Sequence, residues 1–204
     1  MKTLLIVDDD PTIREVFSLI LSSQGYTVHC ADGGVSCIET LKSITPDLVL
    51  LDIMMHPVDG WETLTTIRNN PYTGQVPAIM FSGKTPSREE VINYGGWIHD
   101  YLMKPITMPI VSHALNDVFH RCNADAETRQ YHMKNGTDPR IIDEYLQLRR
   151  FLFIRNKFSR ELFRDSESTG YGPIPQKARF DELSSQLAIP GMNVSSEPEN
   201  TAGI

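Results

Sequence analysis

Cysteine is scarce in this chain of 204 residues, and the few cysteines are too far apart to form a recognisable framework. They are Cys30, Cys37 and Cys122, an odd number without a Cys-x-x-Cys pair. A disulfide network or a cysteine zinc site is therefore not expected. The six histidines also lack metal-ligand spacing such as His-x-x-x-His.

Long hydrophobic runs are missing as well. No apolar run approaches the roughly 20 residues that cross a bilayer. The chain opens with Met1-Lys2-Thr3, and only four apolar residues follow before Asp8, too few for the apolar region of a signal peptide. We therefore expect a reduced, soluble, cytoplasmic protein without a membrane partner.

Positive charge is also in short supply, since the formal net charge is −7. Residues 1–120 contain 7 Lys/Arg and 14 Asp/Glu, whereas residues 121–204 contain 12 of each. The acidity belongs to the first part of the chain, and the rest is rich in charge but balanced. This distribution does not favour nucleic acid as a partner.

Apolar runs alternate with amphipathic segments as far as about residue 120. Strands are predicted at 3–7, 26–30, 47–51, 77–81 and 98–103. Helices are predicted at 11–23, 33–43, 60–69 and 86–94, and a last one from about 107. Asp10-Pro11 is typical of a helix start, with a side-chain cap followed by proline. Alternation of this kind predicts an α/β fold with a five-stranded parallel, doubly wound sheet.

Polar residues stand where four of the predicted strands end. Asp8 and Asp9 follow the first strand, Asp52 the third, Ser82 the fourth and Lys104 the fifth. The carboxyl ends of parallel strands meet at one edge of a sheet, where α/β proteins bind ligands. Three acids, a hydroxyl and an amine together suggest a divalent metal beside a phosphoryl group.

Phosphoryl transfer to a carboxylate needs an ionised nucleophile, neutralised phosphoryl oxygens and fixed donors. Asp52 is the candidate nucleophile. Asp8 and Asp9 are hard oxygen ligands that, with Asp52, suit Mg²⁺ (or Mn²⁺). Lys104 supplies a compact positive charge and Ser82 a hydroxyl donor. Asp10 is assigned to helix capping rather than to the metal.

Four motifs in this order give the chain a family resemblance. They are Ile-Val-Asp8-Asp9-Asp10, Leu-Leu-Asp52, Met-Phe-Ser82-Gly-Lys and Tyr101-Leu-Met-Lys104-Pro105. Over roughly residues 1–123 the chain resembles the receiver domain of two-component response regulators, of the kind found in chemotaxis regulators. The resemblance implies a flavodoxin-like sheet with strand order 2-1-3-4-5.

The resemblance also implies a role for each site residue. Asp52 would accept a phosphoryl group from a sensor histidine kinase, and Lys104 would bind the phosphate. Asp8 and Asp9 would hold the metal together with Asp52 and the backbone carbonyl of Met54. Ser82 would be the switch hydroxyl and Tyr101 the switch aromatic, remodelling a surface that a downstream protein or phosphorelay partner recognises. In this family the Lys104-Pro105 bond is often cis.

Residues near the acceptor suggest slow chemistry and no conventional enzyme. Met54 and Lys84 occupy variable positions beside the site, and neither activates water, so we expect slow self-dephosphorylation. His56 stands where the family commonly has proline, which leaves the shape of that loop open. An aspartate-dependent phosphohydrolase would need an acid where Met54 stands, so that class is disfavoured.

The chain changes character after the receiver-like part. Residues 124–137 are interpreted as a helix end and connector, and 138–165 as an amphipathic helical extension. Its apolar face must be buried, either on the receiver or on its copy in a homodimer. The alternative is a transcription regulator that uses 138–165 as a nonstandard DNA-binding or dimerising output. Residues 166–204 have the composition of a disordered tail. Phe180, Leu183 and Leu187 have the spacing of one short helix, for which no docking role is expected.

Overall fold

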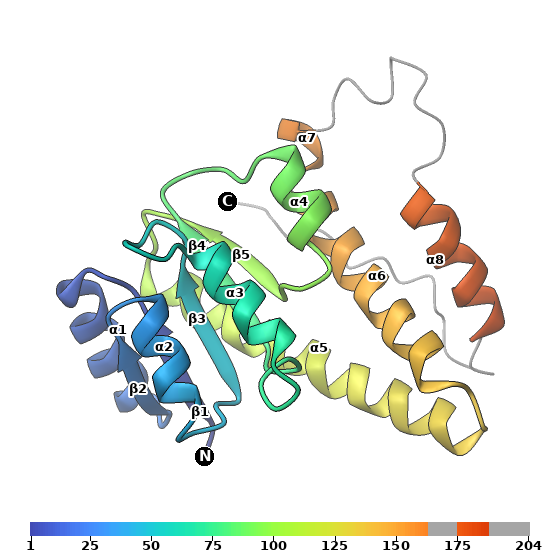
Figure 1. Ribbon diagram of the computed structural model, residues 1–204, viewed down its shortest axis with the longest axis horizontal. Coiled ribbons are helices and arrows are strands. Elements are labelled where there is room, and N and C mark those ends of the chain that lie inside the picture. The colour runs from blue at the N-terminus through green and yellow to red at the C-terminus, as the bar shows by residue number, and fades with distance from the viewer. Residues whose placement is uncertain (163–174, 188–204) are drawn as a thin grey trace. The chain divides into compact units, whose positions relative to one another are not determined.

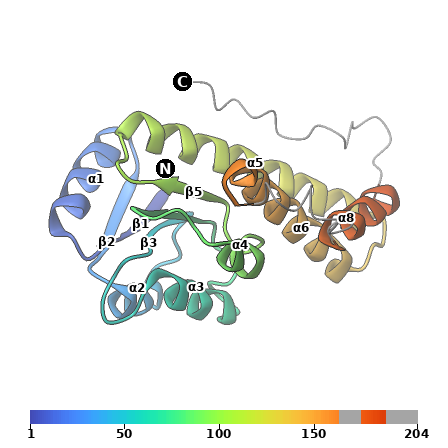
Figure 2. The ribbon, with the colours of Figure 1, turned by 90° about the horizontal axis from the view of Figure 1, so that it is seen from above.

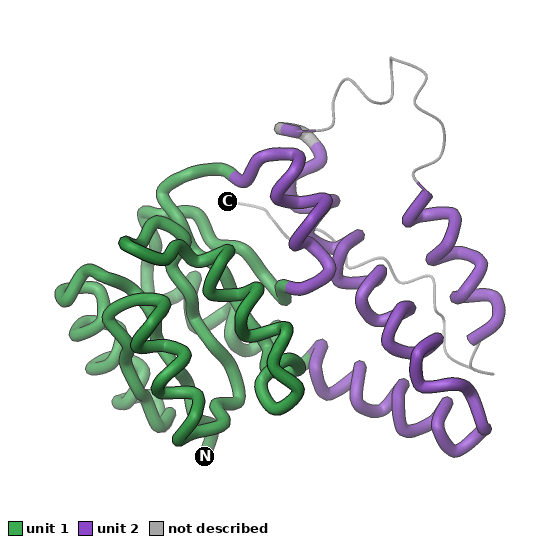
Figure 3. The backbone as a smooth tube through the Cα atoms, viewed as in Figure 1, with its two compact units in different colours: residues 1–85, 98–120 green, residues 86–97, 121–204 purple. Residues whose placement is uncertain are grey.

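The computed structural model describes residues 1–162 and 175–187. The chain divides into two compact units (Figure 3). Unit 1 comprises residues 1–85 and 98–120, and unit 2 comprises residues 86–97 and 121–204. The division is not sequential, because residues 86–97 group with the chain after residue 120.

Unit 1 is built on a parallel sheet of five strands in the order β2-β1-β3-β4-β5 (Figure 1). The strands are β1 Thr3–Val7, β2 Thr27–Ala31, β3 Leu48–Asp52, β4 Ala78–Ser82 and β5 Asp100–Met103. Every residue of β3 and β4 is buried, as expected for central parallel strands covered on both faces. The predicted α/β fold and strand order are confirmed.

Helices cover both faces of this sheet. The first part of α5 (Met108–Lys134) and α1 (Pro11–Ser23) lie on one face, and α2 (Gly34–Leu41) and α3 (Gly60–Asn69) on the other (Figure 2). The side chain of Asp10 accepts a hydrogen bond from the backbone N–H of Thr12 and so caps α1. The capping role predicted for Asp10 is thus observed.

Unit 2 is helical. It contains α4 (Arg88–Tyr94), the second part of α5, α6 (Pro139–Lys157), α7 (Ser159–Leu162) and α8 (Pro175–Gln186). α6 packs against both α4 and α8. Ion pairs of Arg129 with Asp143 and of Arg149 with Asp125 join α6 to α5. Within the described ranges 1–162 and 175–187, no helix has the length and apolarity needed to cross a membrane.

The extension departs from the single helix predicted over 138–165. Asp138 and Pro139 start α6 as expected, but the helix ends at Lys157. Phe158 leaves helical geometry at φ −106° and ψ 12° while its side chain stays buried, and the short α7 follows. The predicted residues 163–165 lie outside the described part of the chain.

The composition of residues 166–204 predicts disorder, with one possible short helix marked by Phe180, Leu183 and Leu187. That helix is observed, so the prediction of disorder does not hold for residues 175–187. Residues 175–186 form α8, and Leu183 of this helix and Leu187 just after it are buried against Ile142, Tyr145 and Leu146 of α6. The Arg179 guanidinium also contacts both carboxylate oxygens of Glu144 at 2.8 and 3.0 Å. The helix therefore has a docking surface within unit 2, which its polar composition concealed. Residues 166–174 and 188–204 lie outside the described ranges.

Candidate functional site

The strand register brings the predicted site residues to one edge of the sheet. Val7 pairs with Leu51, so Asp8 and Asp52 extend from neighbouring strands at the same level. Ser82 pairs with Met103, which places Lys104 one residue beyond Ser82 on the adjoining strand. Four separate parts of the chain thus contribute to one site.

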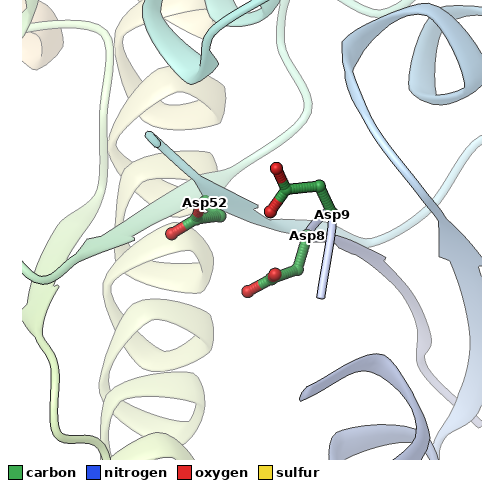
Figure 4. A group of neighbouring side chains, drawn as sticks. All are labelled: Asp8, Asp9 and Asp52. Atoms are coloured by element: carbon green, nitrogen blue, oxygen red, sulfur yellow. The ribbon is translucent and has the colours of Figure 1, made fainter. Parts of the chain in front are cut away.

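Three carboxylates gather at this edge (Figure 4). Asp8, Asp9 and Asp52 each offer an oxygen, and these oxygens all lie within 4.8 Å of one another. Asp8 is 1% exposed and Asp52 is 2% exposed, whereas Asp9 is exposed to solvent. A cluster of hard oxygens with one open side fits Mg²⁺ or Mn²⁺, which retain water ligands.

Lys104 lies between the two buried carboxylates. Its Nζ is 2.8 Å from Asp52 Oδ1 and 3.2 Å from Asp8 Oδ2. Burial lowers the pKa of Lys104, but its bonds with Asp52 and Asp8 outweigh burial and leave that pKa above the ordinary value. Burial also raises the pKa of Asp8, against the opposing effects of its hydrogen bond from the Asp10 N–H and of Lys104. With three acids and one amine, the cluster retains net negative charge for a cation to neutralise.

A second group connects the site to the loop after β4. Ser82 is buried, and its Oγ accepts a hydrogen bond from the Lys84 N–H at 3.2 Å. Tyr101 is 2% exposed, and its hydroxyl donates to the Lys84 carbonyl at 2.5 Å. Ser82 and Tyr101 therefore both bond to the backbone of Lys84. The Trp61 ring centroid lies 6.4 Å from that of Tyr101.

The loop after Asp52 is shaped by close backbone approach. A Cβ on Gly60 would lie 2.3 Å from the Asp52 carbonyl oxygen, so only glycine lets α3 begin here. Met54 is 60% exposed. The His56–Pro57 bond is cis, and so is Lys104–Pro105, as the resemblance implies.

Arg14 is a site neighbour that the sequence did not reveal. Its Nη1 donates to the backbone carbonyl of Asp8 at 2.6 Å, which holds the start of the β1–α1 loop. The only signal was a basic residue about one turn into the helix after the acidic run. That spacing alone does not distinguish such a contact from an exposed arginine.

Comparison with known proteins identifies a family for the first part of the chain. The response regulator receiver domain family matches residues 4–116. A probable cyclic di-GMP phosphodiesterase of Vibrio cholerae is 36% identical over 109 residues, which are 53% of this chain and 24% of that protein. The transcriptional regulatory protein AfsQ1 of Streptomyces coelicolor is 31% identical over 121 residues, 59% of this chain and 52% of that protein. The chain thus spans about half or less of the length of these relatives.

Solved structures give the same picture. The N-terminal domain of a response regulator receiver protein from Methanoculleus marisnigri is 44% identical, with a TM-score of 0.50, over 58% of this chain and 96% of that one. The response regulator TrrA of Thermotoga maritima, in complex with Mg²⁺ and BeF, is 26% identical. Its TM-score is 0.52 over 58% of this chain and 99% of that one.

Proposed function

This chain belongs to the response regulator receiver domain family, and from that premise we propose that Asp52 accepts a phosphoryl group from a sensor histidine kinase in the presence of Mg²⁺. Phosphorylation of Asp52 would then alter a surface that a downstream protein or phosphorelay partner recognises. On this proposal the chain is not a conventional enzyme, because it modifies only itself.

One observation carries the proposal. Lys104 Nζ lies within 3.2 Å of both Asp8 and Asp52, next to three carboxylates whose oxygens lie within 4.8 Å of one another. A carboxylate meant only to cap a helix or meet solvent needs neither a buried neighbour nor a shared ammonium group. The arrangement supports anionic chemistry in which the attacking oxygen, the cation ligands and a fixed positive charge are adjacent.

Each residue of the site has its own role in phosphoryl transfer. An Asp52 carboxylate oxygen forms a bond to phosphorus while the bond from phosphorus to the kinase histidine nitrogen breaks. Lys104 and the Ser82 hydroxyl bind the phosphoryl oxygens. Asp8, Asp9 and the Met54 carbonyl, with Asp52, would hold Mg²⁺, which supplies charge neutralisation when bound.

The switch would pass through the backbone of Lys84. Ser82 Oγ accepts from the Lys84 N–H, so turning this hydroxyl toward a phosphoryl oxygen releases that bond. Tyr101, which donates to the Lys84 carbonyl, would follow the loop. Both contacts support a loop at Lys84 that has two alternative positions, and a phosphoryl group on Asp52 would shift the equilibrium between them.

Phosphotransfer from a panel of the host's histidine kinases tests the proposal. We expect radiolabel on the wild-type chain in Mg²⁺, none after chelation and none on Asp52→Asn. Asp10→Asn is the matched control, since it makes the same chemical change in the neighbouring loop and asparagine still caps a helix. Equal labelling of Asp52→Asn and wild type would contradict the proposal.

Transcription regulation through residues 138–165, by binding DNA or by dimerising, is the second candidate, favoured by the similarity to AfsQ1. We rank it second because Arg149 and Arg150 form ion pairs with Asp125, which reduces the charge that α6 offers to phosphates. A gel shift with and without beryllofluoride discriminates between the two. We expect no retarded DNA in either lane, and beryllofluoride-dependent retardation would favour the second candidate.

A further inference from the structure

The turn that follows α4 is built for close approach to α6. It contains Gly95 and Gly96, both buried. A Cβ on Gly96 would lie 2.8 Å from Gln147 Cγ and 3.2 Å from the Gln147 carbonyl oxygen. These separations are shorter than ordinary van der Waals contact, so the missing side chain lets the two backbones meet.

Side chains of α6 complete the contact. Arg150 Nε donates to the Gly96 carbonyl at 3.1 Å, and its Nη1 lies 3.6 Å from Asp125 of α5. Phe151 is 5% exposed, and its ring edge lies 3.3 Å from where a Cβ of Gly95 would be. A buried ring, a directed hydrogen bond and the close approach of Gly96 to Gln147 define one arrangement of α4 on α6, because packed interfaces shift between discrete states rather than stretch.

The same helix is attached to the candidate site by covalent chain. Only residues 83–87 separate Ser82, at the end of β4, from the start of α4 at Arg88. Within this link the Lys84 N–H bonds to Ser82 Oγ and the Lys84 carbonyl accepts from Tyr101. A change in the Ser82 bond therefore acts directly on the segment leading into α4.

We propose that α6 is the binding partner of α4 in this protein. The conformational change that follows phosphorylation of Asp52 then acts first on α6 of the same chain. The inference rests on the proposed function. A shift of α4 breaks its contact with Gln147, Arg150 and Phe151 and loosens α6. A partner that binds the α4 side must first displace α6, which makes residues 139–157 an internal competitor for that side.

Hydrogen exchange of the full chain, read by mass spectrometry, tests the coupling. Peptides covering 83–87, 88–97 and 139–157 are compared with and without Mg²⁺ and beryllofluoride, the phosphoryl mimic. We expect the mimic to slow exchange in 83–87 and to speed exchange in α6 on the order of fivefold or more, typical of coupling between sites. Asp52→Asn should abolish every one of these changes.

Two variants disturb the contact between α4 and α6 without changing the phosphorylation site. Gly96→Ala should make α6 exchange without the mimic as fast as wild type does with it, while the response of 83–87 persists. Arg150→Gln, which removes the bond to the Gly96 carbonyl without adding bulk, should act in the same direction if Gly96→Ala folds poorly. Arg140→Gln is the matched control, because Arg140 lies on α6 with its side chain 90% exposed and pairs with Asp138; it should behave as wild type.

The outcomes are distinguishable. A mimic response in 83–87 and α4 with α6 unchanged would overturn the inference and leave the proposed function standing. No mimic response in any of the three peptides would contradict the proposed function, and the inference would fall with it. An α6 response that survives both Gly96→Ala and Arg150→Gln would show that the α4–α6 contact does not carry the signal.

Discussion

Removing the ammonium group of Lys104 should destabilise the protein in a way that a divalent cation reverses. Lys104 Nζ is 2.8 Å from Asp52 and 3.2 Å from Asp8, and both carboxylates are almost fully buried. Lys104→Met leaves these acids facing each other without a cation. The protein must then protonate one carboxylate, hydrate the pair or bind a metal ion there.

The size of the effect follows from the geometry. At an effective dielectric constant of about 20, charges separated by 2.8 Å attract with about 6 kcal/mol of gross Coulomb energy. Desolvation cancels much of this, and breaking one side of a buried pair typically costs about 3–5 kcal/mol. Because the Lys104 side chain is 30% exposed, solvent screening reduces the expected loss to about 2–3 kcal/mol.

Urea unfolding measures this loss directly. We expect a decrease of about 2–3 kcal/mol in the free energy of unfolding in EDTA, shrinking to less than about 1 kcal/mol in saturating Mg²⁺. The reason is that the metal would neutralise the same carboxylates. Lys2→Met is the control: Lys2 pairs with Asp47 at 2.9 Å with its side chain 50% exposed, so its loss should stay below about 1 kcal/mol in both buffers. Equal losses for Lys104→Met with and without Mg²⁺ would refute the reasoning.

Four further predictions follow from packing, burial and the site. Gly60→Ala should lower the free energy of unfolding by about 2–3 kcal/mol and impair labelling of Asp52, because the new Cβ would meet the Asp52 carbonyl oxygen at 2.3 Å. Gly33→Ala is the control: a Cβ there has no neighbour nearer than 3.9 Å, so the loss in the same urea assay should be less than about 1 kcal/mol. Leu183→Ala should release α8, seen as fast hydrogen exchange over 175–187, because Leu→Ala at a fully buried site costs about 2–5 kcal/mol; Gln186→Ala, on the exposed side, should leave exchange unchanged. Burial lowers the pKa of His132 below its ordinary value of 6.5. The stability that neutral His132 contributes is therefore present above pH 6.5 and is lost as the pH falls through the lowered pKa of the folded state. Thermal melts should therefore show a smaller drop between pH 7.5 and pH 5 for His132→Gln than for wild type, and equal drops would rule out His132 as a source. Isolated phosphoprotein should lose its label over minutes or longer at neutral pH without a phosphatase, and a lifetime of seconds would contradict the interpretation of Met54 and Lys84.

The family of residues 4–116 and the fold of the five-stranded sheet could be predicted from the sequence. Apolar runs of strand length alternating with capped amphipathic segments permit few arrangements other than a covered parallel sheet. Asp8, Asp52, Ser82 and Lys104 each follow such a run, and parallel strands bring their carboxyl ends to one edge. The juxtaposition of these residues was therefore predictable, while their roles in phosphoryl transfer remain predictions.

Finer features of the site depended on the tertiary structure. The hydrogen bond from Arg14 to the Asp8 carbonyl, the approach of Gly60 to Asp52 and the bond from Tyr101 to Lys84 depend on how loops and neighbouring elements fold back on one another. Residue type and spacing indicate that such groups lie near one another. They do not specify which backbone atom a long side chain reaches.

The helical extension after residue 138 shows most clearly which features the sequence determines and which depend on tertiary structure. Amphipathic spacing by itself determined that residues after 138 form a helix with an apolar face to bury. Only the tertiary structure decided that the helix ends at Lys157, that α8 covers Ile142, Tyr145 and Leu146, and that Gly96 meets Gln147. The physical reason is that hydrophobic burial has no direction: a sequence states how much apolar surface must leave water, and the shapes of the folded elements select the surface that receives it.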